Sequence, residues 1–392
     1  MKPIGILGGG QLARMLVLEA HRLNLPVAVL SPSTEDPAHA VSGTAVQGDP
    51  NSLKALETFM SRCSVVTFES EFYDAAAIEQ ASRKTAVPVW PNPNLMARLQ
   101  DRLPQKRLFD EFKIPTAPWF DVDRHPREIL NALGGKAVFK KRRGGYDGYG
   151  TFVVRSEKDL ATLPDTIEKK QEFIAEKLIS FRREIALIAV RDRRGQCFFF
   201  PFVESKQENS RCLWVKGPLK ETAAFIQMKR KIARFLGKTG YVGAMGIEMF
   251  ETKTGELLVN EIAPRVHNTG HYTMDAFTLN QFSLHLRAVA GLPVSSRSVR
   301  YRQVLSKTTH SKTSFAMWNL LGSNSKPKSH TTALSPWKAR TLSPEAELHW
   351  YGKTEARPGR KMGHVNAIAK TPEKALALAR KAARSLVKDI GF

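Results

Sequence analysis

Short apolar runs alternate with helical patterns over the first 95 residues, and this alternation constrains the fold more than any other feature of the chain. Three runs rich in aliphatic residues lie at residues 3–7, 27–30 and 65–68. The apolar side chains between the first two runs recur at helical spacing: Leu12, Met15, Leu16 and Ala20. Strands that alternate with helices form a parallel sheet, so an α/β domain is expected over residues 1–97.

Beyond this domain the pattern changes to strand-like runs separated by glycine turns, with one long amphipathic stretch at residues 221–236. This mixture predicts an α+β domain. The expected organisation is a second domain at 98–293 with a lid at about 115–180, a basic linker at 294–314 and a C-terminal β-rich segment at 315–392. The predicted fold class is therefore α/β and α+β in one chain.

A glycine motif joins the first strand to the first helix: Gly8-Gly9-Gly10-Gln11-Leu12-Ala13. It fits the G-x-G-x-x-A fingerprint of dinucleotide sites, but such sites also need an acidic residue at the end of the second strand, where this chain has Leu30-Ser31-Pro32. The motif therefore favours a helix N-terminus that holds a smaller phosphate or carboxylate, with Gly10 and Gln11 as substrate ligands. A purely structural tight turn is the alternative.

A second glycine motif follows the expected strand 137–140. Lys140 lies on that strand, and a loop with glycines at 144, 145, 148 and 150 leads into the next strand at 151–154. Glycines let backbone N–H groups approach phosphate oxygens, and a strand lysine supplies a fixed positive charge. Such a loop can also close as a lid. An exposed hairpin tip with basic side chains is the alternative.

Two expected strands surround the turn Thr252-Lys253-Thr254-Gly255. Folding them as a hairpin about this turn sets Glu248 opposite or next to Glu261. Opposed carboxylates are destabilising unless a cation lies between them, and oxygen ligands with room for phosphate suit Mg²⁺. The pattern predicts a magnesium site, with solvated strand glutamates as the alternative.

The chain is strongly basic, with 60 Lys and Arg against 37 Asp and Glu and a net charge of +23. No acidic residue occurs between Asp275 and Glu345. Nucleic-acid binding is one interpretation, but the cations are not interleaved with stacking aromatics and no nucleic-acid-binding motif accompanies them. We expect a solvated basic face and no nucleic-acid partner.

Neither a membrane segment nor a cysteine-based site is expected. No apolar run reaches the roughly 18–20 residues of a membrane span, and the N-terminus leads into a strand and helix instead of a signal peptide, which favours a cytoplasmic protein. The three cysteines, Cys63, Cys197 and Cys212, are widely spaced without a CxxC pair.

A lysine strand, a glycine lid and a glutamate hairpin in this order resemble the ATP-grasp fold. Four longer segments narrow the resemblance to the carboxyaminoimidazole ribonucleotide synthase family: residues 5–12, 143–148, 260–271 and 357–364. The resemblance covers nearly the full chain. It implies an ATP-dependent ligase of purine biosynthesis that uses ATP, Mg²⁺ and bicarbonate to carboxylate the amine of 5-aminoimidazole ribonucleotide, as a homodimer.

The resemblance also implies roles for individual residues. Arg102, Lys140, the glycines Gly144, Gly145, Gly148 and Gly150, and Asn260 would contact ATP. Glu176, Lys177, Leu178 and Ile179 would form the adenine hinge, and Glu184 would hold the ribose. Glu248 and Glu261 would hold Mg²⁺. Arg265, His267, Asn268 and His271 would line the catalytic pocket, and Tyr146, Asp147, Lys353 and Arg360 would bind the aminoimidazole ribonucleotide, the last two through its phosphate.

Three positions depart from the family pattern. Tyr149 stands where the family has Lys or Arg, Gln207 where it has a histidine, and Phe72 where it has a polar Asn or His. The missing cation removes one expected phosphate ligand. Two further functions follow as alternatives: a diverged ATP-grasp ligase for another amine, and a basic relative that binds nucleotides or nucleic acid without turnover.

Overall fold

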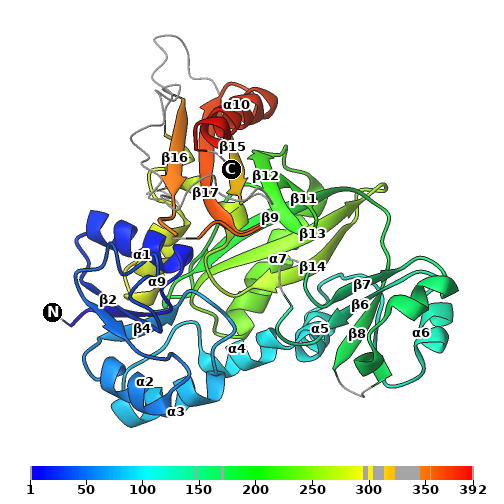
Figure 1. Ribbon diagram of the computed structural model, residues 1–392, viewed down its shortest axis with the longest axis horizontal. Helices are drawn as coiled ribbons and strands as arrows, with labels where there is room; N and C mark the ends of the chain where they lie inside the picture. The colour runs from blue at the N-terminus through cyan, green and yellow to red at the C-terminus, as the bar shows by residue number, and fades with distance from the viewer. Residues whose placement is uncertain are drawn as a thin grey trace.

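The computed structural model describes residues 2–145, 148–168, 172–294, 299–302, 313–322, 345–353 and 355–390. Within them the chain forms three sheets: a parallel sheet near the N-terminus, a small antiparallel sheet that projects to one side, and a large central sheet (Figure 1). Among the helices of these residues, none combines the length and the apolar character needed to cross a membrane.

The N-terminal sheet has four parallel strands in the order β3-β2-β1-β4. Its strands and the helices that follow them are β1 Ile4–Leu7, α1 Gln11–Arg22, β2 Val27–Ser31, β3 Ala45–Gln47, α2 Leu53–Met60, β4 Val65–Phe68, α3 Ala75–Thr85 and α4 Pro93–Gln100. The four apolar side chains that recur at helical spacing in α1 are all buried, and all four belong to one core with strand residues such as Ile6 and Val29. The predicted parallel α/β domain is therefore confirmed.

The small antiparallel sheet, called the lid sheet below, has the order β5-β8-β6-β7. Its elements are β5 Trp119–Asp121, α6 Pro126–Ala132, β6 Ala137–Lys141, β7 Thr151–Val154, the 3-10 turns η1 Glu157–Thr162 and η2 Asp165–Glu168, and β8 Phe173–Lys177. It has its own apolar core, which includes Ile129, Leu130 and Phe139. The loop at residues 142–150, called the lid loop, joins β6 to β7.

The central sheet has nine strands in the order β14-β13-β9-β11-β12-β15-β17-β16, with β10 on β9. Its strands are β9 Phe181–Arg191, β10 Cys197–Phe199, β11 Val203–Glu208, β12 Arg211–Gly217, β13 Gly243–Thr252, β14 Leu257–Ala263, β15 Ser314–Leu321, β16 Ala346–Trp350 and β17 Lys361–Ala369. The associated helices are α5 Arg102–Glu111, α7 Ala223–Lys238, the 3-10 turn η3 Asn268–Gly270, α8 Thr273–Ala276, α9 Gln281–Val289 and α10 Pro372–Ile390.

Helices cover both faces of the central sheet, and β9 shows why. Ile185 and Leu187 belong to the core that contains the apolar side chains of α7. Ala186 and Ile188, which point to the other face, belong to the core shared with α1 and α9. A strand segment that is apolar at every position must be buried on both faces, so the run at residues 185–190 of β9 requires this layered arrangement.

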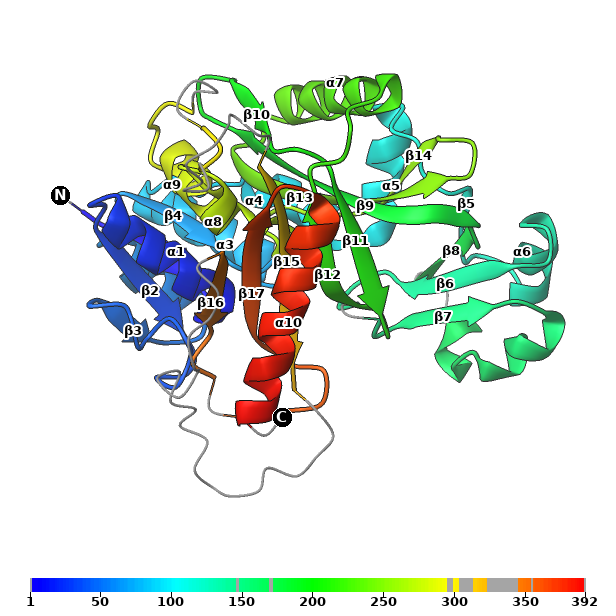
Figure 2. The ribbon, with the colours of Figure 1, turned by 90° about the horizontal axis from the view of Figure 1, so that it is seen from above.

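The C-terminal strands continue the same sheet. β15 pairs with β12 on one side and with β17 on the other. α10 lies along β15 and β17 (Figure 2), and its small side chains Ala375, Ala379 and Ala383 are buried in that contact. The C-terminal segment is thus part of the same sheet as β13 and β14, which carry candidate-site residues.

Candidate active site

Lys140 joins the lid sheet to the central sheet. It extends from β6, donates a hydrogen bond from Nζ to Asn260 Oδ1 on β14 at 2.8 Å, and lies 2.6 Å from Glu176 Oε2 on β8. A buried lysine held by two partners has a fixed direction. Its charge therefore lies at a defined place below the lid loop, as a phosphate ligand requires.

Glu176 is the centre of a buried ion-pair cluster that sequence reasoning missed. Its second oxygen lies 2.7 Å from Nζ of Lys106, whose side chain is only 2% exposed. Burial opposes the charged form of Glu176, but Lys140 and Lys106 outweigh it and lower the pKa to about 2. Both oxygens of the Glu176 side chain are paired with lysines, so its backbone is the part that remains for the predicted adenine hinge.

The other hinge residues lie where the chain passes from the lid sheet to the central sheet. Lys177 ends β8 and donates its N–H to Pro118 O at 2.8 Å, and Ile179 lies just before β9. Glu184, the predicted ribose ligand, lies on β9 and accepts the N–H of Gln207 at 3.1 Å. Gln207, one of the three positions that depart from the family pattern, therefore holds the predicted ribose ligand Glu184 through its backbone N–H.

Arg102 lies at the base of the lid loop. It begins α5, its N–H donates to Arg142 O at 3.0 Å, and its Nη1 lies 3.2 Å from Glu261 Oε2. A Cβ atom at Gly145 would lie 3.6 Å from its guanidinium. Gly144, Gly148 and Gly150 have φ values of +70°, +84° and +73°, so the loop uses a backbone conformation that favours glycine.

Asp101 fixes the start of the lid loop, a contact that sequence reasoning missed. Its carboxylate accepts hydrogen bonds from Nε and Nη2 of Arg142 at 2.8 and 2.6 Å and from Arg143 at 3.2 Å, and it caps α5 through Leu103 N–H at 3.0 Å. An Asp directly before a predicted helix is a recognisable cap in the sequence. Its two arginine partners carry no such local signal.

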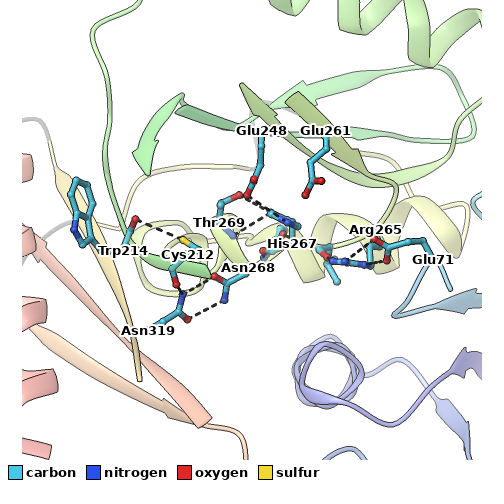
Figure 3. Close-up of polar contacts among 12 residues, drawn as sticks. Glu71, Cys212, Trp214, Glu248, Glu261, Arg265, His267, Asn268, Thr269 and Asn319 are labelled. Carbon is cyan, nitrogen blue, oxygen red and sulfur yellow. Dashed lines mark hydrogen bonds and ion pairs between the residues drawn. The ribbon is translucent and has the colours of Figure 1, made fainter. Parts of the chain in front are cut away.

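The predicted opposition of the two carboxylates is confirmed. Glu248 on β13 pairs with Glu261 on β14 in the strand register, and Figure 3 shows the two side chains next to each other with His267 directed at Glu248. Burial opposes the charge on Glu261, but Arg102 and Lys140 lower the pKa of this carboxyl below its ordinary value.

This arrangement fits Mg²⁺ bound together with a nucleotide. Within the described ranges, no cluster of three or more His, Cys, Asp or Glu side chains could hold a metal alone. Two opposed carboxylates next to the amide of Asn260 leave most of the coordination shell to a ligand. Mg²⁺ is characteristically bound in this way, by one or two carboxylates together with substrate phosphates.

Arg265 and His267 lie where the N-terminal domain meets the central sheet. Arg265 forms a two-point ion pair with Glu71, with Nη2 to Oε1 at 2.9 Å and Nε to Oε2. His267 lies with Nε2 3.9 Å from Glu248 Oε1 and Nδ1 2.8 Å from Thr269 Oγ1. Burial and the charge of Arg265 hold the pKa of His267 well below its ordinary value, so its ring is neutral at neutral pH.

Asn268 and His271 contact the C-terminal strands, and their predicted place in the catalytic pocket stays a prediction. The amide of Asn268 exchanges two hydrogen bonds with Asn319 of β15, at 3.1 and 2.7 Å. His271 is fully buried, with its ring 4.8 Å from that of His364. Both side chains are used in holding the C-terminal strands to η3.

The N-terminus of α1 is occupied by a carboxylate of the protein itself. Glu69 accepts hydrogen bonds from the N–H groups of Gly10 and of Ala13, the latter at 2.9 Å. A Cβ atom at Gly10 would lie 2.6 Å from Glu69 Oε1, so a larger residue would displace this carboxylate. The N–H of Gly10 is thus bonded to a carboxylate of the protein, and the roles of Gly10 and Gln11 as substrate ligands stay predictions.

The predicted phosphate clamp lies between β16 and β17. Lys353 donates from Nζ to Lys361 O at 2.8 Å, and Arg360 donates from Nη1 to Glu355 O at 3.0 Å. The turn before Arg360 is fixed by Gly359 N–H to Gly322 O at 2.8 Å. The other predicted ribonucleotide ligands, Tyr146 and Asp147, lie outside the described residues.

Comparison with known proteins gives matches along the chain. The family models of the ribonucleotide synthetase preATP-grasp domain, the ATP-grasp domain and the phosphoribosylaminoimidazole carboxylase C-terminal domain match residues 1–100, 107–282 and 316–378. An N5-carboxyaminoimidazole ribonucleotide synthase of Synechococcus elongatus is 37% identical over 92% of this chain and 88% of its own length.

Solved structures give the same result. A carboxyaminoimidazole ribonucleotide synthase of Aspergillus clavatus with ATP has a TM-score of 0.84 and 31% identity. The match covers 99% of this chain and 98% of its own. The Aspergillus clavatus enzyme in complex with ADP and 5-aminoimidazole ribonucleotide has a TM-score of 0.83 and 30% identity, over 100% of this chain and 98% of its own. The predicted fold class is confirmed by these matches.

Proposed function

This chain belongs to the N5-carboxyaminoimidazole ribonucleotide synthase family, and from this premise we propose how its residues carry out the family's ATP-dependent ligation. The reaction joins the carboxyl group of bicarbonate to the amine of 5-aminoimidazole ribonucleotide and converts ATP to ADP and phosphate. The observation that supports it most directly is the convergence of Lys140, Arg102 and Asn260 on the opposed pair Glu248 and Glu261, at the base of a glycine lid.

The first step is phosphoryl transfer. An oxygen of bicarbonate forms a bond to the γ-phosphorus of ATP as the bond from that phosphorus to the ADP oxygen breaks, which gives carboxyphosphate. Lys140 and Arg102 hold the phosphates by charge, and the lid loop excludes water from the reacting group. When Mg²⁺ is bound with ATP, Glu248, Glu261 and the Asn260 oxygen would hold it, and it would neutralise phosphate charge.

The second step forms the new C–N bond. The exocyclic amine attacks the carboxyl carbon of carboxyphosphate, the bond from that carbon to the phosphate oxygen breaks, and the amine releases a proton. Arg265, oriented by Glu71, stabilises the oxyanion that develops at this carbon. His267, neutral and next to Glu248, is the candidate acceptor of the proton.

The substrate phosphate is proposed to bind Lys353 and Arg360, and Asn268 and His271 are proposed to line the catalytic pocket with Arg265 and His267. A cytoplasmic homodimer is also proposed, because the family resemblance favours it; sedimentation of the purified protein tests the dimer.

Release of ADP from the purified protein tests the activity. ADP release that requires both bicarbonate and 5-aminoimidazole ribonucleotide is the expected result. Release that needs bicarbonate and a different amine would favour the diverged ligase. Binding of ATP without release under any of these conditions would favour a relative that has lost turnover.

A further inference from the structure

The tip of the β11–β12 hairpin is a two-residue turn. Glu208 and Arg211 are its last paired residues, and Asn209 and Ser210 between them have φ values of 48° and 60°. Two successive left-handed residues characterise the type I′ turn, which matches the twist of the strands it joins. Arg211 is therefore the first residue of an ordered strand, and its position is set by the strand pairing.

This tip touches both the lid loop and the phosphate clamp. A Cβ atom at Gly148 of the lid loop would overlap the side chain of Ser210. A Cβ atom at Gly359 would overlap the guanidinium of Arg211. The guanidinium thus lies directly against the glycine that precedes Arg360, and both glycines have positive φ values, +84° and +74°. A hairpin tip that lies between two predicted ligand-binding segments can contact the same ligand as they do.

The charge around Arg211 also points to an anion. Its side chain is half-buried, and within the described part of the chain its guanidinium makes no hydrogen bond or ion pair. The cations Arg360 and Lys353 belong to the adjacent segment, and the carboxylate of Glu355 in that segment is bonded to Arg357 at 2.6 Å. Gathered positive charges are unfavourable unless an anion compensates them, and a planar guanidinium suits phosphate.

We propose that Arg211 is a third cation of the clamp that binds the 5′-phosphate of the ribonucleotide, beside Lys353 and Arg360. It supplies the charge that the family pattern places at position 149, where this chain has Tyr149 with a 66% exposed side chain. This inference rests on the proposed function, since it assigns a ligand to the same site. Because Ser210 contacts Gly148, phosphate at Arg211 also lies next to the lid loop.

Calorimetric binding of the ribonucleotide, without turnover, tests this assignment. Arg211→Ala is expected to raise the dissociation constant about tenfold or more, since a charge-assisted phosphate contact is lost, and to leave that for ATP within about twofold. Arg211→Lys should give an intermediate value. Lys220→Ala is the matched control: it removes one exposed cation beyond the other end of β12 and should leave both constants unchanged.

The outcomes separate this inference from the proposed function. If the wild-type protein binds the ribonucleotide and Arg211→Ala binds it equally well, the assignment of Arg211 is overturned while the proposed function stands. If Arg211→Ala weakens ATP and ribonucleotide alike, its role is structural and the assignment is also overturned. If the wild-type protein does not bind the ribonucleotide, both are overturned.

Two further measurements address the phosphate and the replaced cation. Ribose 5-phosphate should bind Arg211→Ala more weakly than wild type, whereas ribose itself should not distinguish them; an equal loss for ribose contradicts a phosphate contact. Introducing Tyr149→Arg into Arg211→Ala should recover part of the ribonucleotide affinity. An unchanged affinity would overturn the statement that Arg211 replaces a lid cation.

Discussion

Glu261 shows how one side chain of this site can serve two partners. Without a ligand its charge is balanced by Arg102 at 3.2 Å, although Glu248 lies opposite it in the hairpin. Burial opposes this charge, but Arg102 and Lys140 lower the pKa of the carboxyl. The side chain is therefore ionised before any metal arrives, so binding of a metal–nucleotide complex requires no proton release from Glu261.

Glu261→Gln is expected to weaken the use of MgATP, because it removes half of the paired negative charge while keeping the shape of the side chain. We expect the Mg²⁺ concentration for half-maximal activity to rise about tenfold, with no change in thermal unfolding. The same substitution at Glu256, an exposed residue near the tip of the same hairpin, is the control. An unchanged Mg²⁺ requirement in Glu261→Gln would contradict the metal assignment.

At the scale of elements, local periodicity predicted most of what the structure contains. The helix α1, the strands β6 and β7 and the opposition of Glu248 and Glu261 all follow from spacing within a few residues or across one turn. The contacts between Glu69 and α1 and between Asn268 and Asn319 do not. They join residues 51 or more apart, and such pairs are set by how strands and helices pack in three dimensions, for which a single sequence has no periodic signal.

The Lys106–Glu176–Lys140 cluster links α5, β8 and β6, and its loss should destabilise the protein. Glu176→Gln leaves two buried lysines without their carboxylate, which costs about 3–5 kcal/mol of the free energy of unfolding. Denaturant unfolding measures this cost. The matched control is Glu347→Gln at an exposed position on β16, which should unfold almost as the wild type does.

The pH dependence of this cost follows from the pKa of Glu176. Its pKa in the folded protein, about 2, lies below its ordinary value of 4.5. The unfolded state therefore binds more protons, and the stabilisation is complete above pH 4.5 and is lost as the pH falls from there through 2. The difference between wild type and Glu176→Gln should be constant near neutral pH and shrink over that acidic range. A difference that is the same at pH 3 and pH 7 would contradict the cluster's role.

Asp101 connects α5 to the lid loop, and two substitutions separate its two contacts. Asp101→Asn keeps an oxygen for the cap of Leu103 N–H but loses the charge that holds Arg142 and Arg143, whereas Asp101→Ala loses both. We expect both variants to raise the KM for ATP and to speed amide exchange in the lid loop, and only Asp101→Ala to lower thermal stability noticeably. Unchanged exchange in the lid loop of Asp101→Asn would contradict the anchoring of the lid by these arginines.

At the scale of the whole molecule, three sheets meet at the site and each supplies different chemistry. The lid sheet supplies Lys140 and the glycines, the central sheet the carboxylates and His267, and the N-terminal domain Glu71, which orients Arg265. The site exists only when the three parts are packed together. All the proposed substrates are anions, and they approach a chain with a net charge of +23.

This charge predicts how substrate capture depends on salt. Long-range attraction raises the capture rate at low ionic strength and is screened within about 8 Å at 0.15 M salt. Between 0.02 and 0.3 M salt, as rough limits, kcat/KM for the ribonucleotide should fall more steeply than kcat/KM for bicarbonate, because the phosphate of the former carries about two charges. The turnover number at saturating substrate should change little. Equal slopes for the two substrates would contradict steering by net charge.

Variants of the predicted linker test whether its cations contribute to the attraction of the substrates or instead bind nucleic acid. Replacing Arg297, Arg300, Lys307 and Lys312 with Gln should flatten the salt dependence for the ribonucleotide, whereas exchanging Arg for Lys and Lys for Arg at the same positions keeps the charge and should not. Three of these positions, 297, 307 and 312, lie outside the described residues. A nucleic-acid site would behave differently, with oligonucleotide affinity falling along a steep logarithmic salt slope that depends on the number of phosphates neutralised. The expectation of a solvated basic face would be overturned by tight oligonucleotide binding at about 0.15 M salt, a physiological value. This binding would have to be lost in the Gln variant and kept in the variant with Arg and Lys exchanged.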